Sequence, residues 1–240
     1  MEIRIFSDAG DLANAAADVF EETVLRKPDA VLGLATGASP VLTYRELIRR
    51  YEAGRLSFAR VTTFNLDEYC DLPRDDKNSY YSFMQENLFS KVDIDPARIH
   101  IEDGNAADFE AEANAYDAKI EAAGYIDLQL LGIGTNGHIG FNEPADAFTE
   151  GTFRIKLTES TIKANSRYFT DSRMPEYALT MGVGTIMKAK KILLIATGNA
   201  KAEAVYNTVK GPVTPRCPAS VLQTHPDAVL MLDEAAAALL

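Results

Sequence analysis

The sequence predicts a single-domain α/β fold, a three-layer sandwich in which a mostly parallel sheet carries helices on both faces. Short apolar runs of strand length alternate with segments of helical periodicity along the whole chain. Strands that are separated by helices pair in parallel. The length of 240 residues, 47% of them hydrophobic and 25% charged, suits one globular domain. We therefore expect one α/β domain over residues 1–240.

The N-terminal segment begins this alternation. Met1–Phe6 is predicted to be a strand. A helix follows, for which Asp8 is a candidate N-cap, and its apolar residues recur at helical spacing: Leu12, Ala16, Val19, Phe20 and Val24. Ala30–Ala35 is continuously apolar, which is typical of a parallel strand buried on both faces. Thr36–Pro40 ends that strand, and a second helical face begins at Val41.

The middle of the chain continues the pattern with shorter elements. Val61–Leu66 is predicted to be a third strand, and Tyr80–Val92 a helix with aromatic and leucine residues on one side. A short strand is expected at Ile99–Ile101 and an Ala/Glu-rich helix at Ala106–Ala123. No solenoid repeat, low-complexity tract or Ser/Gly linker interrupts the sequence, so nothing indicates a second domain.

The C-terminal half repeats the unit of strand, loop and helix. Asp127–Ile133 is predicted to be a buried strand that opens into the long loop Gly134–Pro144. Lys191–Ala196 is a further strand, followed by Thr-Gly and a helix. Ala228–Leu232 is the last predicted strand, and a short Ala-rich helix is expected after it.

Composition excludes several classes of function. The net charge of −11 argues against a nucleic-acid-binding surface, which needs a basic stripe. No apolar run approaches the roughly 20 residues of a membrane span, and the N-terminus lacks the apolar segment of a signal peptide. Cys70 and Cys217 stand alone, without a CxxC pair or a nearby histidine. We expect buried, reduced thiols in a cytoplasmic protein and no metal site.

Candidate functional residues lie in the loops after the predicted strands, because open parallel sheets bind ligands beyond the carboxyl ends of their strands. Thr36, Gly37, Ala38 and Ser39 form the first such loop. Its backbone N–H groups, hydroxyls and helix dipole could receive an anion, although it is neither a Walker A motif nor a dinucleotide motif. The alternative is an ordinary strand-to-helix turn.

Two adjacent carboxylates, Asp67 and Glu68, follow the third predicted strand. Neighbouring side chains of an extended segment point in opposite directions, so at most one of the two is expected to face a pocket. A solvated turn is the alternative. In the Gly-rich loop 134–144, Asn136, His138 and Glu143 bring a carboxamide, an imidazole and a carboxylate close together. A histidine and a glutamate at this spacing suit proton transfer on a sugar or acyl substrate, and a structural histidine is the alternative.

The remaining histidines and two isolated cations are less distinctive. His100 and His225 are expected to be surface or capping residues. Arg167 and Lys201 are of a kind that usually belongs to a solvated surface. Lys201, however, lies in the first turn of a predicted helix after a strand, where a phosphate could bridge it and the helix N-terminus.

The segment 137–144, Gly-His-Ile-Gly-Phe-Asn-Glu-Pro, is the most specific motif of the chain. With it, most of the sequence resembles the glucosamine-6-phosphate deaminase family, the glucosamine/galactosamine-6-phosphate isomerases of short-chain type. The sister 6-phosphogluconolactonases share a Gly-His core but lack the Phe-Asn-Glu-Pro ending. The segments that carry the resemblance are Leu32–Gly37, Phe64–Tyr69, Leu131–Pro144, Ala178–Thr185 and Pro218–Ser220.

The resemblance implies roles for the acid–base residues. Asp67 matches the base that moves a proton between C2 and C1 of the sugar through an enediol-type intermediate. His138 matches the residue that opens the pyranose ring, and Glu143 a carboxylate that supports this step. Asn136 stands where many members have Asp. Its carbonyl could accept a hydrogen bond from the imidazole, but it carries no negative charge.

The resemblance also implies a phosphate site and a lid on a modified Rossmann-like fold. Thr36, Gly37, Ala38 and Ser39, together with Arg167 and Lys201, match the phosphate-binding residues. The segment Thr158–Met174, including Tyr168, would form a helical lid that excludes water from the intermediate. No metal and no cofactor is implied, because a carboxylate can transfer the proton by itself.

The expected reaction is the conversion of glucosamine 6-phosphate and water to fructose 6-phosphate and ammonia. A sugar-phosphate lactonase and a non-catalytic sugar-phosphate sensor are the alternatives on the same fold. The expected partner is this small-molecule substrate, with no nucleic acid and no membrane. Longer family members are hexamers that extend beyond the position of Leu240, so we expect a simpler enzyme, monomeric and not allosteric.

Overall fold

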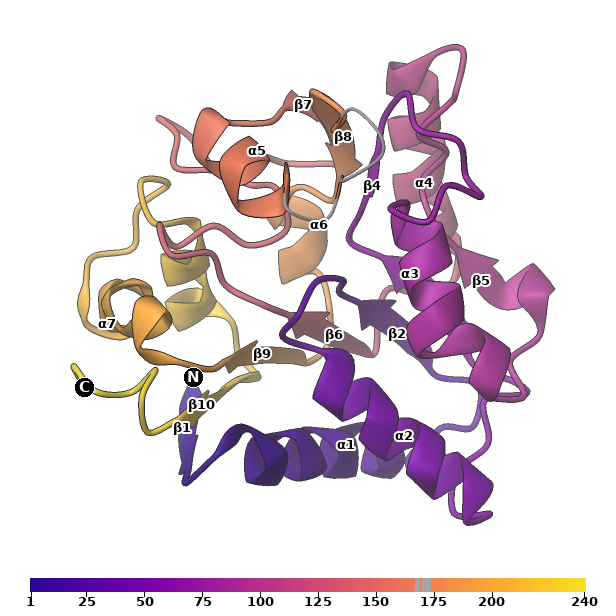
Figure 1. The fold of residues 1–240 in the computed structure, drawn as a ribbon, viewed down its shortest axis with the longest axis horizontal. Helices are drawn as coiled ribbons and strands as arrows, with labels where there is room; N and C mark the ends of the chain where they lie inside the picture. Colours follow the sequence, from indigo (N-terminus) through magenta and orange to yellow (C-terminus); the bar gives the residue numbers. More distant parts are fainter. Residues whose placement is uncertain (167–168, 170–173) are drawn as a thin grey trace.

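The computed structural model describes residues 1–166, 169 and 174–240 (Figure 1). Its main sheet has seven strands, all of them parallel. In spatial order these are β1 (Glu2–Phe6), β10 (Ala228–Asp233), β9 (Ile192–Ala196), β6 (Leu128–Leu131), β2 (Val31–Leu34), β3 (Thr62–Asn65) and β5 (Ile99–His100). The predicted mostly parallel sheet is therefore confirmed.

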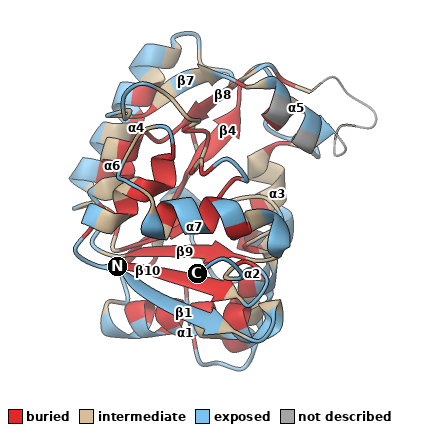
Figure 2. Cartoon of the chain, turned by 90° about the vertical axis from the view of Figure 1, so that its left-hand side faces the viewer, coloured by how far each residue is buried: buried red, intermediate tan, exposed pale blue. Residues whose placement is uncertain are grey.

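Burial follows the position of each strand in this sheet. Every residue of β2, β6 and β9 is buried, which explains the continuous apolar sequences of β2 and β9. The edge strand β1 is mostly exposed, as Figure 2 shows. Its isoleucines, Ile3 and Ile5, are exposed, and only Phe6 at its end is partly buried.

Helices cover both faces of the sheet, as predicted for a three-layer sandwich (Figures 1 and 2). Helices α1 and α2 pack against each other on one face, and α6 and α7 lie over the other. Asp8 caps α1 as expected, because its Oδ1 accepts hydrogen bonds from the backbone N–H groups of Gly10 and Asp11 at 2.7 and 2.9 Å. The α-helices are α1 (Ala9–Arg26), α2 (Val41–Glu52), α3 (Tyr80–Asn87), α4 (Phe109–Ala122), α5 (Glu159–Asn165), α6 (Val183–Met187) and α7 (Ala202–Lys210).

Short 3-10 turns complete the helical structure: η1 (Phe89–Lys91), η2 (Pro96–Arg98), η4 (Asn199–Lys201) and η5 (Pro218–Thr224). At two of these turns, η1 and η4, the structure differs from the predicted helices. The helix expected over Tyr80–Val92 ends at Asn87, because Leu88 leaves the helical conformation with φ −148° and ψ −62° before η1. The helix expected at Lys201 begins with the turn η4 and becomes regular in α7.

A second sheet was not predicted. It consists of three antiparallel strands in the order β4 (Asp67–Tyr69), β8 (Tyr177–Thr180) and β7 (Phe153–Lys156). It lies beyond the main sheet, on the side of α6 and α7 (Figure 2). The segment 65–69, expected to be a loop, contains the end of β3 and all of β4. These strands are too short to show a period, and their partners lie far away in the sequence.

The prediction of a short helix after the last strand is wrong. Residues 234–239 form turns instead. The carboxylate of Asp233 accepts hydrogen bonds from the backbone N–H groups of Ala236 and Gly198. The alanines that follow favour a helix only by intrinsic propensity, a weak signal that tertiary contacts override. No helix in the part of the chain described here is long and apolar enough to cross a membrane.

The two cysteines and the two unassigned histidines have structural places. Cys70 and Cys217 are free thiols and buried, as predicted. His100 is partly buried and stacks on Phe64, with ring centroids 4.6 Å apart. His225 is only 3% exposed, and both ring nitrogens bond backbone groups, so the expected surface position is wrong while the capping role is right.

Candidate active site

Loops from four adjacent strands of the main sheet enclose one cavity of about 440 Å³. They follow β2, β3, β6 and β9, so the prediction that the site lies beyond the carboxyl ends of the strands agrees with the structure. The residues expected from the sequence that line this cavity are Thr36, Gly37, Ala38, Ser39, Asp67, His138 and Lys201. Asn136 and Glu143 contact one another beside His138, and Arg167 lies outside the described residues.

Asp67 is the first residue of β4 and faces the cavity from a buried position, with 6% of its surface exposed. Burial raises the pKa of its carboxyl group to about 8, and the neighbouring charge of Glu68 acts in the same direction. A long contact of 3.5 Å from the Thr36 hydroxyl opposes this shift. A carboxyl group with this pKa can both accept and release a proton near neutral pH.

Glu68 points away from the cavity, as the alternation along an extended segment predicts. Its carboxylate accepts three backbone hydrogen bonds, from the N–H groups of Tyr69, Tyr80 and Tyr81, at 2.8 to 2.9 Å. Burial raises the pKa of Glu68, and these three donors oppose the shift. Glu68 therefore joins β4 to the first turn of α3, and the alternative of a solvated turn is wrong.

His138, Glu143 and Asn136 form a contiguous group. Oε2 of Glu143 lies 3.4 Å from Nδ1 of His138 and accepts a 2.7 Å hydrogen bond from the Asn136 amide. The Asn136 carbonyl accepts from the backbone N–H of His138 at 3.2 Å. The expectation that this carbonyl could face the imidazole is therefore wrong, because the side-chain oxygen is used by the backbone. Asn136 holds Glu143 and the turn rather than the histidine ring.

The electrostatics of Glu143 follow from its surroundings. Burial by itself would raise the pKa of its carboxyl group. The imidazole of His138 and the donors Thr161 and Asn136 outweigh burial and lower the pKa to about 2. Glu143 is therefore an anion at neutral pH, placed to stabilise a positive charge on His138.

Glycines allow the loop 134–144 to approach its neighbours closely. A Cβ atom at Gly134 would lie 2.3 Å from the ring of His138, so only glycine leaves room for this ring. A Cβ atom at Gly140 would lie 2.9 Å from the Thr180 hydroxyl and 3.6 Å from Oδ2 of Asp67. The loop therefore packs against Asp67, and the two predicted catalytic segments meet.

Another part of the cavity lining is suited to an anion. Gly37 has φ +86°, and Pro40 at the N-cap of α2 makes no side-chain capping bond, so N–H groups of the first turn remain for a ligand. Lys201 reaches the same cavity from η4. Burial lowers the pKa of its ammonium group, a cost that a bound phosphate would offset.

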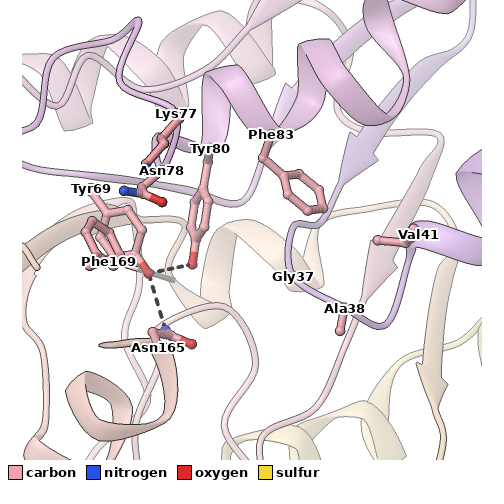
Figure 3. A pocket seen from close by; sticks show the side chains of 10 residues that line it. All are labelled: Gly37, Ala38, Val41, Tyr69, Lys77, Asn78, Tyr80, Phe83, Asn165 and Phe169. Carbon is pink, nitrogen blue, oxygen red and sulfur yellow. Dashed lines mark hydrogen bonds between the residues drawn. The ribbon is translucent and has the colours of Figure 1, made fainter. Parts of the chain in front are cut away.

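A second cavity of about 310 Å³ adjoins the first and is walled by aromatic rings (Figure 3). Tyr80 borders both cavities, and so does Asn165 of α5. The hydroxyl of Tyr80 donates to that of Tyr69 at 3.2 Å, and the Asn165 amide donates to the same Tyr69 oxygen at 3.3 Å (Figure 3).

Sequence reasoning missed Tyr80, Thr161 and Asn165 as site residues. Tyr80 was assigned only to a helix. The other two lie within the expected lid Thr158–Met174, of which α5 is the described helical part, while Tyr168 lies outside the described residues. Thr161 and Asn165 are polar and four positions apart, and this spacing could have indicated from the sequence that they share one face of a helix. Within the described residues, no group of three or more His, Cys, Asp or Glu could hold a metal ion.

Comparisons with known proteins agree on a family. Residues 7–231 match the family described as glucosamine-6-phosphate isomerases/6-phosphogluconolactonase. A glucosamine-6-phosphate deaminase of Clostridioides difficile is 48% identical over 238 residues, 99% of this chain and 96% of the relative. One of Halothermothrix orenii is 48% identical over 241 residues, with complete coverage of both chains.

Solved structures give the same result. A structure described as a monomeric glucosamine-6-phosphate deaminase matches with a TM-score of 0.97 and 45% identity over the full length of both chains. The 6-phosphogluconolactonase of Trypanosoma brucei matches with a TM-score of 0.77 and 21% identity, over all of this chain and 98% of that one. The second likeness shows a shared fold.

Proposed function

The chain belongs to the family of glucosamine-6-phosphate isomerases and 6-phosphogluconolactonases, and we propose that it is an enzyme that converts glucosamine 6-phosphate and water to fructose 6-phosphate and ammonia. One observation carries the proposal. A buried carboxyl group, Asp67, faces the same cavity as His138 and the anion-binding loop 36–39. An isomerisation of an amino-sugar phosphate needs these three parts within the length of one substrate.

Ring opening is the first step. The pyranose opens when a proton leaves the C1 hydroxyl and another reaches the ring oxygen, which produces the open-chain aldehyde. His138 carries this proton, and the anionic Glu143 beside Nδ1 stabilises the imidazolium that forms in passing. Asn136 holds Glu143 in place through its amide. Because Asn136 is neutral, Glu143 alone supplies the negative charge of this group.

Proton transfer between carbons is the second step. The ionised carboxylate of Asp67 removes the proton from C2, and the ammonium group of the substrate gives one proton to O1. The product is an enolamine, the amino counterpart of an enediol. Asp67 then returns the proton to C1, so C2 becomes an iminium carbon. Water adds to C2 and ammonia leaves, which completes fructose 6-phosphate. Burial suits Asp67 to this role because a desolvated carboxylate is a stronger base than one in water.

Phosphate binding belongs to another part of the cavity lining. The loop 36–39 and the N-terminus of α2 offer backbone N–H groups and hydroxyls, and Lys201 offers a cation. Arg167 is included in this proposed phosphate site because it matches a phosphate-binding residue of the family. A local cluster of donors is necessary, because the net charge of −11 repels a phosphate dianion at long range.

A lactonase is the alternative that the family description also covers. Hydrolysis of a sugar-phosphate lactone requires an attacking water but no proton transfer between C2 and C1. The buried Asp67 facing the cavity would then have no task. The relatives at 48% identity are deaminases, whereas the solved 6-phosphogluconolactonase named above shares only 21% of its residues with this chain.

An ammonia-release assay tests the proposal. Purified protein is incubated with glucosamine 6-phosphate under metal chelation, and ammonia and fructose 6-phosphate are measured. We expect both products in equal amounts. A parallel assay follows hydrolysis of 6-phosphogluconolactone. Lactone hydrolysis without ammonia release would overturn the proposal in favour of the lactonase, and binding without either reaction would favour a sensor.

The proposal also covers the domain organisation, the location and the oligomeric state of the protein. We take residues 1–240 to act as one sugar-phosphate isomerase/deaminase domain in the cytoplasm. The proposed state is a monomer, supported by the structural neighbour that is described as monomeric.

A further inference from the structure

The carboxylate of Glu143 is held from two sides, and one of them is α5. The hydroxyl of Thr161 donates to Oε1 of Glu143 at 2.5 Å. The single proton of the Thr158 hydroxyl is shared between the Thr161 hydroxyl at 3.0 Å and the same Oε1 at 3.3 Å. Thr158 also caps α5, because its hydroxyl accepts from the backbone N–H of Thr161. The first turn of α5 is therefore built around Glu143.

The two oxygens of Glu143 have separate partners. Oε1 is used by the two threonines, whereas Oε2 meets the Asn136 amide and Nδ1 of His138. Because a carboxylate is planar, fixing Oε1 sets the direction of Oε2. Thr161 is only 6% exposed, so little water is available to replace its hydroxyl. The orientation of Glu143 toward the histidine therefore depends on Thr161.

The same helix reaches the aromatic wall of the site. Asn165 follows Thr161 by four residues, so both side chains lie on one face of α5. Asn165 donates to the hydroxyl of Tyr69, which also accepts from Tyr80 (Figure 3). Both Thr161 and Asn165 line the main cavity. One short helix thus contacts the ring-opening group through Thr161 and the wall beside Asp67 through Asn165.

We propose that Thr161 is a positioning residue for ring opening. Its hydroxyl orients Glu143 so that Oε2 faces His138. The alignment of Glu143 with His138 therefore depends on the position of α5. The inference rests on the proposed function, since ring opening is a step of that reaction. Thr161 acts through Glu143 and does not itself transfer a proton to the sugar.

Thr161→Val and Thr161→Ser separate positioning from packing. Valine keeps the branched shape and removes the hydroxyl, whereas serine keeps the hydroxyl and removes a methyl group. We expect kcat with glucosamine 6-phosphate to fall about tenfold or more in Thr161→Val while KM changes less than about threefold. Thr161→Ser should restore kcat to within about threefold of the wild type. The reverse order of the two variants would mean that Thr161 only fills space.

Ser166→Ala is the matched control. It removes a hydroxyl from the end of the same helix, where Ser166 is exposed and its hydroxyl donates to the backbone carbonyl of Lys163 at 3.0 Å. We expect its kcat to stay within about twofold of the wild type. A loss equal to that of Thr161→Val would show that any change in α5 impairs the enzyme, and the proposal would fall.

A double-mutant cycle with Glu143→Gln tests whether Thr161 acts through Glu143. In the Glu143→Gln background, Thr161→Val should change kcat by less than about twofold, because the oriented carboxylate is already lost. Equal losses in both backgrounds would contradict the proposal.

The four proteins of this cycle, which are the wild type, Thr161→Val, Glu143→Gln and the double variant, also allow a measurement that needs no substrate. The unfolding equilibrium constants, measured in urea, should show a coupling of about threefold or more between positions 161 and 143. Additive effects would mean that the hydroxyl does not hold the carboxylate. Absence of ammonia release from the wild type would refute the proposed function, while the coupling would still report on this contact.

Discussion

The proposed role of Asp67 as a base and its contribution to the stability of the fold oppose each other. Asp67 is buried at the end of a three-residue strand, and burial raises its pKa from 3.8 to about 8. The unfolded chain loses this proton at lower pH than the folded chain does. The contribution of Asp67 to stability is therefore fully present below pH 3.8 and declines as the pH rises to about 8. A base that is strong because it is desolvated destabilises the ionised folded state.

The variant Asp67→Asn should separate the effect of Asp67 on catalysis from its effect on stability. We expect exchange of the C2 proton with solvent to be abolished while substrate binding remains measurable, since an amide cannot act as the base. At pH 8 to 9 the variant should be more stable than the wild type by at least about 1 kcal/mol, and at pH 4 the difference should shrink. Urea unfolding at both pH values measures it, with the exposed Asp75→Asn as the control. Normal proton exchange would show that Asp67 is not the base.

The pH dependence of the rate follows from the same group. Only the ionised form of Asp67 can accept the C2 proton, so kcat/KM should rise with an apparent pKa near 8, the value that burial gives the free enzyme. Initial rates between pH 6 and pH 9 measure this profile. A rate that is independent of pH over this range would mean that another group limits the reaction.

Lys201 is expected to contribute to substrate affinity. In Lys201→Ala, the KM for glucosamine 6-phosphate should rise about tenfold or more, because a charge-assisted contact with the phosphate is lost. The exposed Lys210→Ala on α7 is the control and should leave KM unchanged. An unchanged KM in Lys201→Ala would remove this residue from the phosphate site.

At the scale of elements, β4 organises the site. It is short, yet its alternation directs Asp67 into the cavity and Glu68 toward α3. Pairing with β8 holds β4 at the junction of the two sheets. The carboxylate of Glu68 fixes the first turn of α3, and with it the ring of Tyr80 that borders both cavities.

Replacement of Glu68 by Gln tests this connection. The amide can accept some of the three backbone hydrogen bonds, but its NH₂ group would face N–H donors. We expect the free energy of unfolding to fall by about 1–3 kcal/mol. The apparent pKa of Asp67 in the rate profile should also fall, because a neighbouring negative charge is removed. Glu86→Gln, on the exposed side of α3, is the control. A stability equal to the wild type would show that the three bonds are dispensable.

At the scale of the whole molecule, the site lies where the carboxyl edge of the parallel sheet meets the small antiparallel sheet. Four strand-end loops supply the anion site and the two acid–base groups, and α5 lies against the same cavity. All of these parts belong to one chain. A single copy therefore contains a complete cavity.

Sedimentation should accordingly show one species with the mass of a single chain over a wide range of concentration. Addition of the substrate should not change that mass, and the dependence of rate on substrate should be hyperbolic. A hexamer, or a sigmoidal rate curve, would contradict the proposed monomer.

The sequence by itself predicted most strands of the main sheet and several of the residues that line the main cavity. Continuous apolar runs mark strands such as β2 and β9, and the loop 134–144 with Asn136, His138 and Glu143 stands out by its residues. These signals are local, because strand and helix periods and short motifs are set by neighbouring residues. They indicated the strand ends as the place of the chemistry.

Only the tertiary structure decided how distant segments meet. The pairing of β4 with β8 joins residues more than a hundred positions apart, and no local pattern encodes it. The bond from Thr161 to Glu143 is likewise fixed by the packing of separate segments, because it joins α5 to the loop 134–144. A sequence specifies which groups are available, whereas long-range packing decides which of them touch, because each contact depends on the positions of all the elements around it.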